Sequence, residues 1–176
     1  MNYFEFYGIP VSFVVEAEAL RRIFYRKSKQ YHPDFHTLAG EEEQADMLDL
    51  SSLNNEAYKT LSDPDRRMRY ILEINGLLGN ENKQTPLPQD FLMDMMDINE
   101  ALMELEMDPD AARYAETLNE VEQIENQLNT SIKPVLDVFV ADENGIQALP
   151  GVRDFYLKKR YLLRIRENLS KFASAF

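Results

Sequence analysis

A proline in a short polar turn sets the layout of the first half of this chain. Before the turn, apolar side chains recur at Leu20, Phe24 and Tyr31, the spacing of a helix that packs through one face. Pro33 has no backbone N–H and disfavours helical geometry at the residue before it, so we expect the helix to end near His32. The same spacing returns after the turn at Met47, Leu50, Leu53, Ala57 and Leu61. The sequence therefore predicts an antiparallel helical hairpin with this turn at its tip.

The polar residues of the turn are open to several interpretations. Asp34 is of a type that caps the following backbone, and His32 could be a solvated imidazole. His32 and His36 also resemble a metal-binding pair, but Pro33 prevents the helical turn that would align the two rings. The chain has no cysteine to complete a typical zinc site, and we expect neither a metal nor another cofactor.

Two motifs together resemble a J-domain. The stretch from Asn55 to Tyr70, N-E-A-Y-K-T-L-S-D-P-D-R-R-M-R-Y, matches the closing pattern N-x-A-Y-x-x-L-x-D-P-x-x-R of that module. Upstream, Tyr31-His32-Pro33-Asp34 resembles its His-Pro-Asp motif at the matching separation. The resemblance implies that His32, Pro33 and Asp34 dock on the ATPase domain of a DnaK-type chaperone and stimulate ATP hydrolysis. The chemistry then belongs to the partner, and the chain itself is not an enzyme.

The start of the chain is more particular than a general J-domain. The run Y-F-E-F-Y-G-I-P from Tyr3 to Pro10, followed by V-S-F, is similar to the opening of the HscB family, the J-domain co-chaperones of iron–sulfur cluster assembly. Asn2 is expected to cap a short first helix, and Gly8 to end it in the left-handed conformation.

Basic residues gather on the first helix of the hairpin, away from its apolar line. They are Arg21, Arg22, Arg26, Lys27 and Lys29. Such charges usually form a solvated face, and the alternative is a patch that steers an acidic surface of the chaperone towards the turn. Both interpretations stay open. The family pattern differs at Lys27, where many J-domains carry an apolar residue, and at Phe35, where a basic residue is common.

The overall charge narrows the class of partner. The chain of 176 residues carries 19 Lys and Arg against 31 Asp and Glu, a net charge of −12. This charge argues against general nucleic-acid binding and favours partners with basic surfaces. The lack of cysteine fits a reducing compartment. The apolar runs are far shorter than the about 18 residues of a membrane helix, and the first residues resemble neither a signal nor a transit peptide. We therefore expect a cytoplasmic protein.

A further helix is expected to close the first domain. Pro64 suits its first position and Asp63 its cap. Its packed face is predicted to contain Arg67, Tyr70, Ile71 and Ile74. Turn-forming residues then replace helical periodicity, so we predict a J-domain over residues 1–76 and a linker over 77–87.

The remaining residues, 88–176, read as a three-helix antiparallel bundle, which makes the whole chain all-α. The helices are predicted over 88–105, from Asp110 to about Val140 with a kink at Pro134, and from Pro150 to about Ala173, after a turn at 142–145. Their inward residues are expected to be Phe91, Met95, Ile98, Leu102 and Leu105; Leu118, Val121, Ile124, Leu128, Ile132, Val135 and Phe139; and Val152, Phe155, Leu162, Ile165, Leu169 and Phe172.

The first bundle helix has more apolar residues than one packing face needs. Leu92, Met96 and Met103 lie about 100 to 140° from its inward line, with Met93 further round. One explanation is that a bundle helix contacts two neighbours; the other is an adaptable contact surface. In HscB proteins the corresponding Phe-Leu-Met stretch and its acids bind the iron–sulfur scaffold protein IscU. The resemblance carries this role to Leu92, Met93, Met96, Asp97, Glu100 and Glu104, and Tyr156 of the third helix is expected to join them.

The sequence thus predicts a co-chaperone that binds IscU through its bundle and stimulates a DnaK- or HscA-type ATPase through its His-Pro-Asp motif. One alternative is a J-domain co-chaperone with a different client, in which the bundle is repurposed for client binding or dimerisation. Another is a hydrolase or metal enzyme using His32, Asp34 and His36. The chain offers no nucleophile, phosphate-binding loop or ligand set for that chemistry.

Overall fold

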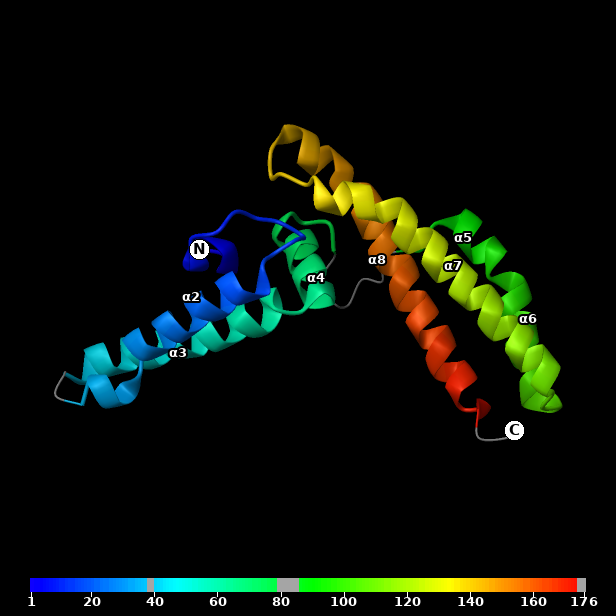
Figure 1. Cartoon of the computed structure of the whole chain (residues 1–176), viewed down its shortest axis with the longest axis horizontal. Coiled ribbons are helices and arrows are strands. Elements are labelled where there is room, and N and C mark those ends of the chain that lie inside the picture. The colour runs from blue at the N-terminus through cyan, green and yellow to red at the C-terminus, as the bar shows by residue number, and fades with distance from the viewer. Residues whose placement is uncertain (38–39, 79–85, 174–176) are drawn as a thin grey trace. The chain divides into compact units, whose positions relative to one another are not determined.

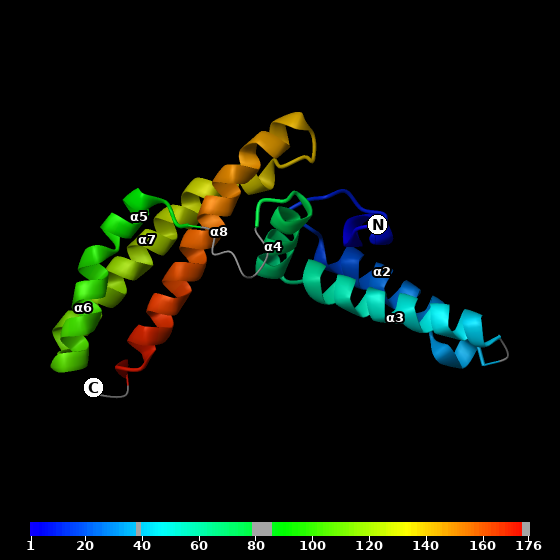
Figure 2. The same cartoon turned by 180° about the vertical axis from the view of Figure 1, so that it is seen from behind.

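The computed structural model describes residues 1–37, 40–78 and 86–173. These residues form helices and turns without a strand, which confirms the predicted all-α class (Figures 1 and 2). The chain divides into two compact units. Unit 1 consists of Met1–Gly76 and Phe139–Ile146, and unit 2 of Leu77–Val138 and Gln147–Phe176. Most of the predicted linker, residues 79–85, lies outside the described residues.

Unit 1 opens with the short helix α1 (Tyr3–Tyr7), which has the predicted ends. The side chain of Asn2 accepts a hydrogen bond from the Glu5 N–H at 2.9 Å, and the Glu5 carboxylate accepts one from the Asn2 N–H at 2.9 Å. Gly8 ends the helix with a φ of 66°, in the left-handed region that glycine adopts without strain. A helix of this length has few internal hydrogen bonds, so these reciprocal caps matter to its stability.

The predicted hairpin is present. Helices α2 (Ala17–Gln30) and α3 (Glu41–Leu61) lie side by side in both views (Figures 1 and 2). The apolar line of α2 packs as expected, with Leu20 and Tyr31 buried and Phe24 stacked on Tyr58 at 4.3 Å between ring centroids. The 3-10 turn η1 (Pro33–Phe35) follows α2 and carries the His-Pro-Asp motif at the tip.

One amide at the hairpin seam was not predicted from the sequence. Asn54, on α3, is 1% exposed. Its Nδ2 donates to the Phe24 carbonyl at 3.2 Å and lies 2.9 Å from Ser28 Oγ, while its Oδ1 accepts from the Tyr7 hydroxyl at 2.9 Å. This single side chain joins α1, α2 and α3, and its hydrogen bonds offset the cost of burying a polar group.

Helix α4 (Pro64–Ile74) is the last helix of the N-terminal segment of unit 1. As predicted, Asp63 caps it: Oδ1 accepts from the N–H groups of Asp65 and Arg66, each at 2.9 Å. The packed face was predicted partly wrongly. Its buried residues are Arg67, Met68, Ile71 and Leu72, whereas Ile74 is 39% exposed.

The buried Arg67 joins α4 to the rest of unit 1 through its hydrogen bonds. Its Nε donates to the carbonyl of Phe13 at 3.0 Å, and its Nη1 donates to the carbonyl of Leu61 at the end of α3. A cation at the C-terminal end of a helix is favourable because it meets carbonyls that have no partner within the helix. Burial lowers the pKa of this guanidinium from its ordinary value, opposed by the nearby charge of Asp63.

A segment from far along the chain also belongs to unit 1. Within Phe139–Ile146, the ring of Phe139 meets that of Phe13 edge-on, with 4.7 Å between centroids. Gly145 is required in this segment because a Cβ there would run into the backbone oxygen of Val140. Phe139, expected to continue the inward face of the long bundle helix, is instead buried in unit 1.

Unit 2 contains α5 (Gln89–Asp94), α6 (Met96–Met107), α7 (Ala111–Asp137) and most of α8 (Glu143–Ser170). The first bundle helix was predicted to be continuous, but it is broken at Met95, where ψ is −3°.

The prediction for α8 was also wrong at its start. Asp142 Oδ1 accepts from the Gly145 N–H at 2.9 Å, so the expected turn caps α8 instead. The helix then continues through Pro150, as α7 continues through Pro134.

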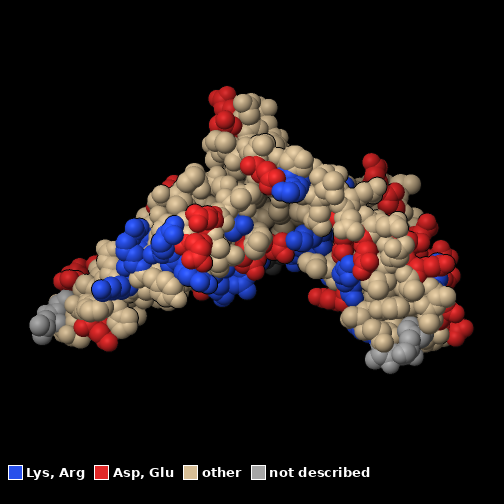
Figure 3. Space-filling view, in the orientation of Figure 1, with Lys and Arg blue, Asp and Glu red and all other residues tan. Residues whose placement is uncertain are grey.

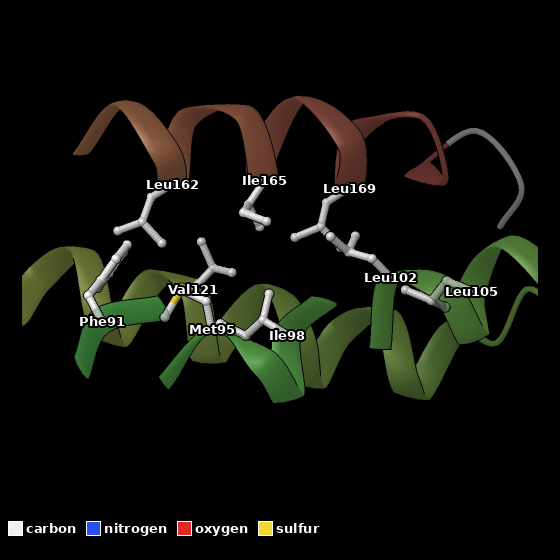
Figure 4. Close-up of a cluster of buried hydrophobic side chains, with 9 residues drawn as sticks. All are labelled: Phe91, Met95, Ile98, Leu102, Leu105, Val121, Leu162, Ile165 and Leu169. Atoms are coloured by element: carbon white, nitrogen blue, oxygen red, sulfur yellow. The ribbon is translucent and has the colours of Figure 1, made fainter. Parts of the chain in front are cut away.

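The core of unit 2 matches the predicted inward residues. Figure 4 shows side chains of α8 pointing at those of α5, α6 and α7. The cluster comprises Phe91, Met95, Ile98, Leu102, Leu105, Val121, Leu162, Ile165 and Leu169. Polar contacts join the same helices at the edge of this core: Asn99 Nδ2 lies 2.9 Å from the Tyr161 hydroxyl, and Arg166 Nε lies 2.8 and 2.9 Å from the two oxygens of Glu125. Among the described residues, no helix has both the length and the apolar content needed to cross a bilayer.

Candidate functional site

The His-Pro-Asp turn is held by its own backbone. The His32 carbonyl accepts from the Phe35 N–H at 3.0 Å, and the Pro33 carbonyl accepts from the His36 N–H at 2.9 Å. His32 Nδ1 accepts from the Asp34 N–H at 3.2 Å. Because Pro33 fixes its own φ and starts the 3-10 turn, few torsions remain free in this tip. The backbone of the turn is therefore fixed by short-range hydrogen bonds.

The His32 and Asp34 side chains face water next to each other. They are 53% and 84% exposed, and His32 Nδ1 lies 3.7 Å from Asp34 Oδ2. Because Nδ1 accepts the backbone N–H, the proton of the neutral imidazole is on Nε2. The Nε2–H group is then the hydrogen-bond donor at the outer edge of the ring. The tip thus offers one hydrogen-bond donor and one carboxylate. Phe35, also exposed, places its ring edge-on to His32 at 5.9 Å between centroids.

His36 does not pair with His32. Its Nε2 lies 2.9 Å from the Gln30 carbonyl, and its Nδ1 lies 3.8 Å from Glu43 Oε1. His36 therefore joins the end of α2 to the start of α3. Throughout the described residues, no group of three or more His, Asp or Glu side chains is arranged to hold a metal ion.

Lys and Arg side chains gather over the α2–α3 hairpin, as Figure 3 shows. Arg22, Arg26 and Lys29 are exposed on α2, and Arg21 is exposed with Glu18 Oε1 at 3.6 Å. Lys27 is different. It is half-buried, with its Nζ 4.1 Å from the centroid of the Phe6 ring, a cation–π contact that holds α1 against α2.

The second candidate surface lies on the outer side of α5 and α6. Leu92, Met93, Met96 and Met103 are 42%, 63%, 66% and 66% exposed, whereas Met95 is fully buried. Asp97, Glu100 and Glu104 are exposed beside them, and Glu104 Oε2 lies 3.0 Å from Arg113 Nε of α7. The hydrogen bond to Glu104 raises the pKa of Arg113, so this guanidinium stays charged.

Two residues differ from the predicted surface. Tyr156 was expected to be exposed with the α5–α6 residues, but it is 7% exposed. Tyr156 follows the buried Val152 by one helical turn and so lies on the same side of α8. The first half of α8 buries a wider arc than the line through Leu162 predicts, and Tyr156 falls within that arc. Met107 was not selected from the sequence, yet it is 87% exposed. Its position one turn after Met103 is the signal that could have found it.

Comparison with known proteins matches the chain to two family models in series. Residues 2–70 match the family model of the DnaJ domain, and residues 87–170 match the model of the HSCB C-terminal oligomerisation domain. A co-chaperone protein HscB homolog from Vibrio cholerae is 36% identical over 117 residues, covering 65% of this chain and 68% of that protein. The chain belongs to the HscB family of co-chaperones.

Other HscB relatives extend the match. The HscB homolog of Shewanella halifaxensis is 28% identical over 177 residues, covering 99% of this chain and 98% of that protein. The solved structure of human co-chaperone protein HscB superposes with a TM-score of 0.70 at 23% identity, covering 100% of this chain and 84% of that one. Chaperone HscB from Vibrio cholerae gives 0.65 at 23% identity, covering 99% of each chain. These two structures confirm the fold. Family membership makes this HscB protein a regulator of an Hsp70-type ATPase, not an enzyme.

Proposed function

We propose that this HscB-family protein is a cytoplasmic co-chaperone of iron–sulfur cluster assembly that brings the scaffold protein IscU to a DnaK- or HscA-type ATPase. The observation that carries the proposal is that two different exposed surfaces lie in two different units. One is the rigid His-Pro-Asp tip of unit 1, and the other is the apolar, acid-bordered face of α5 and α6 in unit 2.

The tip is suited to docking and not to catalysis. His32 offers an outward N–H and Asp34 a carboxylate, and neither side chain is buried beside a group that it could activate. A carboxylate on a rigid turn fits a basic side chain of the chaperone, because a charge-assisted hydrogen bond is stronger when little motion has to be lost. ATP hydrolysis then takes place on the partner.

The basic face of α2 supports the same docking. Arg21, Arg22, Arg26 and Lys29 present positive charge along α2, the helix that leads into the tip, in a chain whose net charge is −12. Exposed charges of this kind raise the rate of association more than the final affinity. We assign steering to these four residues. Lys27 contributes mainly by its contact with Phe6.

The α5–α6 face has the composition of a protein interface. Apolar anchors at Leu92, Met93 and Met96 are bordered by Asp97, Glu100 and Glu104, the arrangement of an apolar centre with a polar rim. The acids favour a scaffold surface that carries basic groups. Methionine side chains are flexible enough to fit a partner of irregular shape.

Coupling follows from binding both proteins at once. A scaffold held by unit 2 is tethered to a chaperone held by unit 1, so its effective concentration at the chaperone rises without any new contact. IscU should therefore increase ATPase stimulation beyond that given by this protein alone.

The test is to titrate purified IscU against the full chain by calorimetry and to measure ATPase stimulation of a DnaK-type chaperone with and without IscU. We expect binding and an additional stimulation. Stimulation by the chain alone, with no binding of IscU, would instead indicate a J-domain co-chaperone with another client. Failure to stimulate the ATPase at all would contradict the role of the His-Pro-Asp tip.

A further inference from the structure

Methionine is unevenly distributed in this protein. The chain has eight methionines. Four of them, on the outer side of α5 and α6, form what we call the methionine face: Met93, Met96, Met103 and Met107, which are 63%, 66%, 66% and 87% exposed. Within α6, Met96, Met103 and Met107 lie within about 20° of one line along the helix. Large apolar side chains on a helix face usually pack inward, and these do not.

The other methionines provide an internal contrast. Met95 is 0% exposed and Met68 6%, so the sulfur atoms of these two lie in cores. Met47 is half-buried, and Met1 is exposed but belongs to unit 1. Oxidation of a thioether requires that the oxidant reach the sulfur atom, so exposure sets the order of reaction. The chain has no cysteine to react first.

We propose that the methionine face is a site of reversible oxidation by peroxides and that its oxidation switches off scaffold binding. This inference rests on the proposed function, because it assigns a regulation to the surface proposed to hold IscU. In each step a sulfur lone pair attacks one peroxide oxygen, an S–O bond forms and the O–O bond breaks. The leaving oxygen takes a proton and departs as water or an alcohol. Sulfur loses two electrons and the peroxide gains them.

The product has a different surface. A sulfoxide is polar, so a partner that packs apolar groups against the methionines must desolvate the new oxygen. The exposed carboxylates of Asp97 and Glu100 border the same face and accept hydrogen bonds only, so they do not compensate for this oxygen. The fold is spared, because Met95 supplies the buried sulfur of the unit 2 core. Methionine sulfoxide reductases restore the thioether.

The first test is the order of oxidation. The full chain is treated with hydrogen peroxide, and the sulfoxide at each methionine is measured by peptide mass spectrometry over time. We expect Met93, Met96, Met103 and Met107 to react before Met95 and Met68. Equal rates at buried and exposed positions would overturn the inference.

The second test is binding. Affinity for purified IscU is measured before peroxide treatment, after treatment that oxidises the exposed methionines, and after reduction by methionine sulfoxide reductases A and B. We expect a loss of about tenfold or more, the effect of losing one interface anchor, and its recovery on reduction. ATPase stimulation by the chain alone and helix content should not change.

Variants separate the face from other damage. In the quadruple variant Met93→Leu, Met96→Leu, Met103→Leu, Met107→Leu, the ratio of affinities before and after peroxide should be close to one, whatever the starting affinity. The matched variant Met47→Leu, in unit 1, should stay fully sensitive. Unchanged binding by the oxidised chain, or equal sensitivity of the quadruple variant, would overturn this inference alone. A reduced chain that does not bind IscU would overturn both this inference and the proposed function.

Discussion

The backbone N–H of Asp34 donates a hydrogen bond to Nδ1 of His32 across 3.2 Å. This contact orients the imidazole and leaves its other nitrogen as the outward donor, while the Asp34 carboxylate remains 84% exposed. Of the two side chains that we propose to contact the chaperone, the imidazole is thus positioned by a local backbone contact, and the carboxylate stands exposed beside it.

Changing His32→Gln or Asp34→Asn should abolish ATPase stimulation while leaving the protein folded. Substitutions at exposed positions away from packed contacts shift the free energy of unfolding by about 0.5 kcal/mol or less. Steady-state ATPase assays and urea unfolding provide the measurement. His36→Gln is the matched control: it should lower stability slightly, through the lost contact with the Gln30 carbonyl, and keep stimulation. Full stimulation by Asp34→Asn would contradict the docking role of the tip.

The basic face of α2 predicts a dependence on salt. Association with the chaperone should slow as salt rises from about 0.05 to 0.5 M, because the screening length shrinks over that range. Stopped-flow kinetics would show the effect mainly in the association rate. Arg22→Glu with Arg26→Glu should reduce both the rate and its salt dependence, whereas Lys59→Glu on α3 should do neither. A rate that is flat with salt would leave these residues as an ordinary solvated face.

Adjacent methionines allow a sharp test of the α5–α6 face. Met93→Ala with Met96→Ala should weaken IscU binding by about 1 to 3 kcal/mol, the range of interface anchors, and hardly change stability. Met95→Ala should do the reverse and cost about 2 to 5 kcal/mol of unfolding free energy, because its side chain is 0% exposed. Calorimetric titration and urea unfolding measure the two effects. Cooperative loss of stability in the Met93 and Met96 variant would place those residues in the core.

The buried hydroxyl of Tyr7 predicts instability at high pH. Burial, with a smaller contribution from Tyr58, raises the pKa of Tyr7 above the ordinary tyrosine value of about 10. Below that pH both folded and unfolded chains hold the proton, so stability is unaffected. Above it the unfolded chain releases the proton first, so the free energy of unfolding falls as pH rises, by at most about 1.4 kcal/mol per unit for this group.

Urea unfolding at about pH 7 and about pH 10.5 checks this linkage. Tyr7→Phe should be less stable at neutral pH, since Asn54 Oδ1 loses its donor, but should lose less on going to high pH. Tyr25→Phe, at a residue 64% exposed, is the control and should behave like the unaltered chain. Parallel losses in the Tyr7 variant and the unaltered chain would contradict the role of this hydroxyl.

Features determined by neighbours in sequence were predicted well. Asn2 and Gly8 bound α1, and Asp63 caps α4, because a cap is a contact between residues a few positions apart. The inward line of α6 was also predicted, since its apolar spacing is regular. The His-Pro-Asp tip followed from Pro33, whose effect on the backbone does not depend on tertiary contacts.

Features determined by tertiary packing were not predicted from the sequence. Asn54 is of a type that is usually exposed, and only the meeting of three helices shows that its hydrogen bonds are satisfied. In the sequence Lys27 cannot be distinguished from its basic neighbours, because its cation–π contact with Phe6 of α1 depends on how the two helices pack. Tyr156 was misplaced because a single inward line was drawn along α8, although the helix buries different arcs in its two halves. The turn formers at 142–145 and Pro150 pointed to a later start, and the Asp142 cap overrode them.

The break at Met95 has a consequence for inhibitor design. Leu92 and Met93 belong to α5, whereas Met96, Met103 and Met107 belong to α6. The two helices are separated at Met95, where ψ is −3° instead of the about −42° of a regular helix. A stapled peptide that copies residues 89–107 as one uninterrupted helix would rotate one group out of register with the other. An effective decoy for the scaffold must reproduce the bend, either in a macrocycle or in a miniature of the whole bundle.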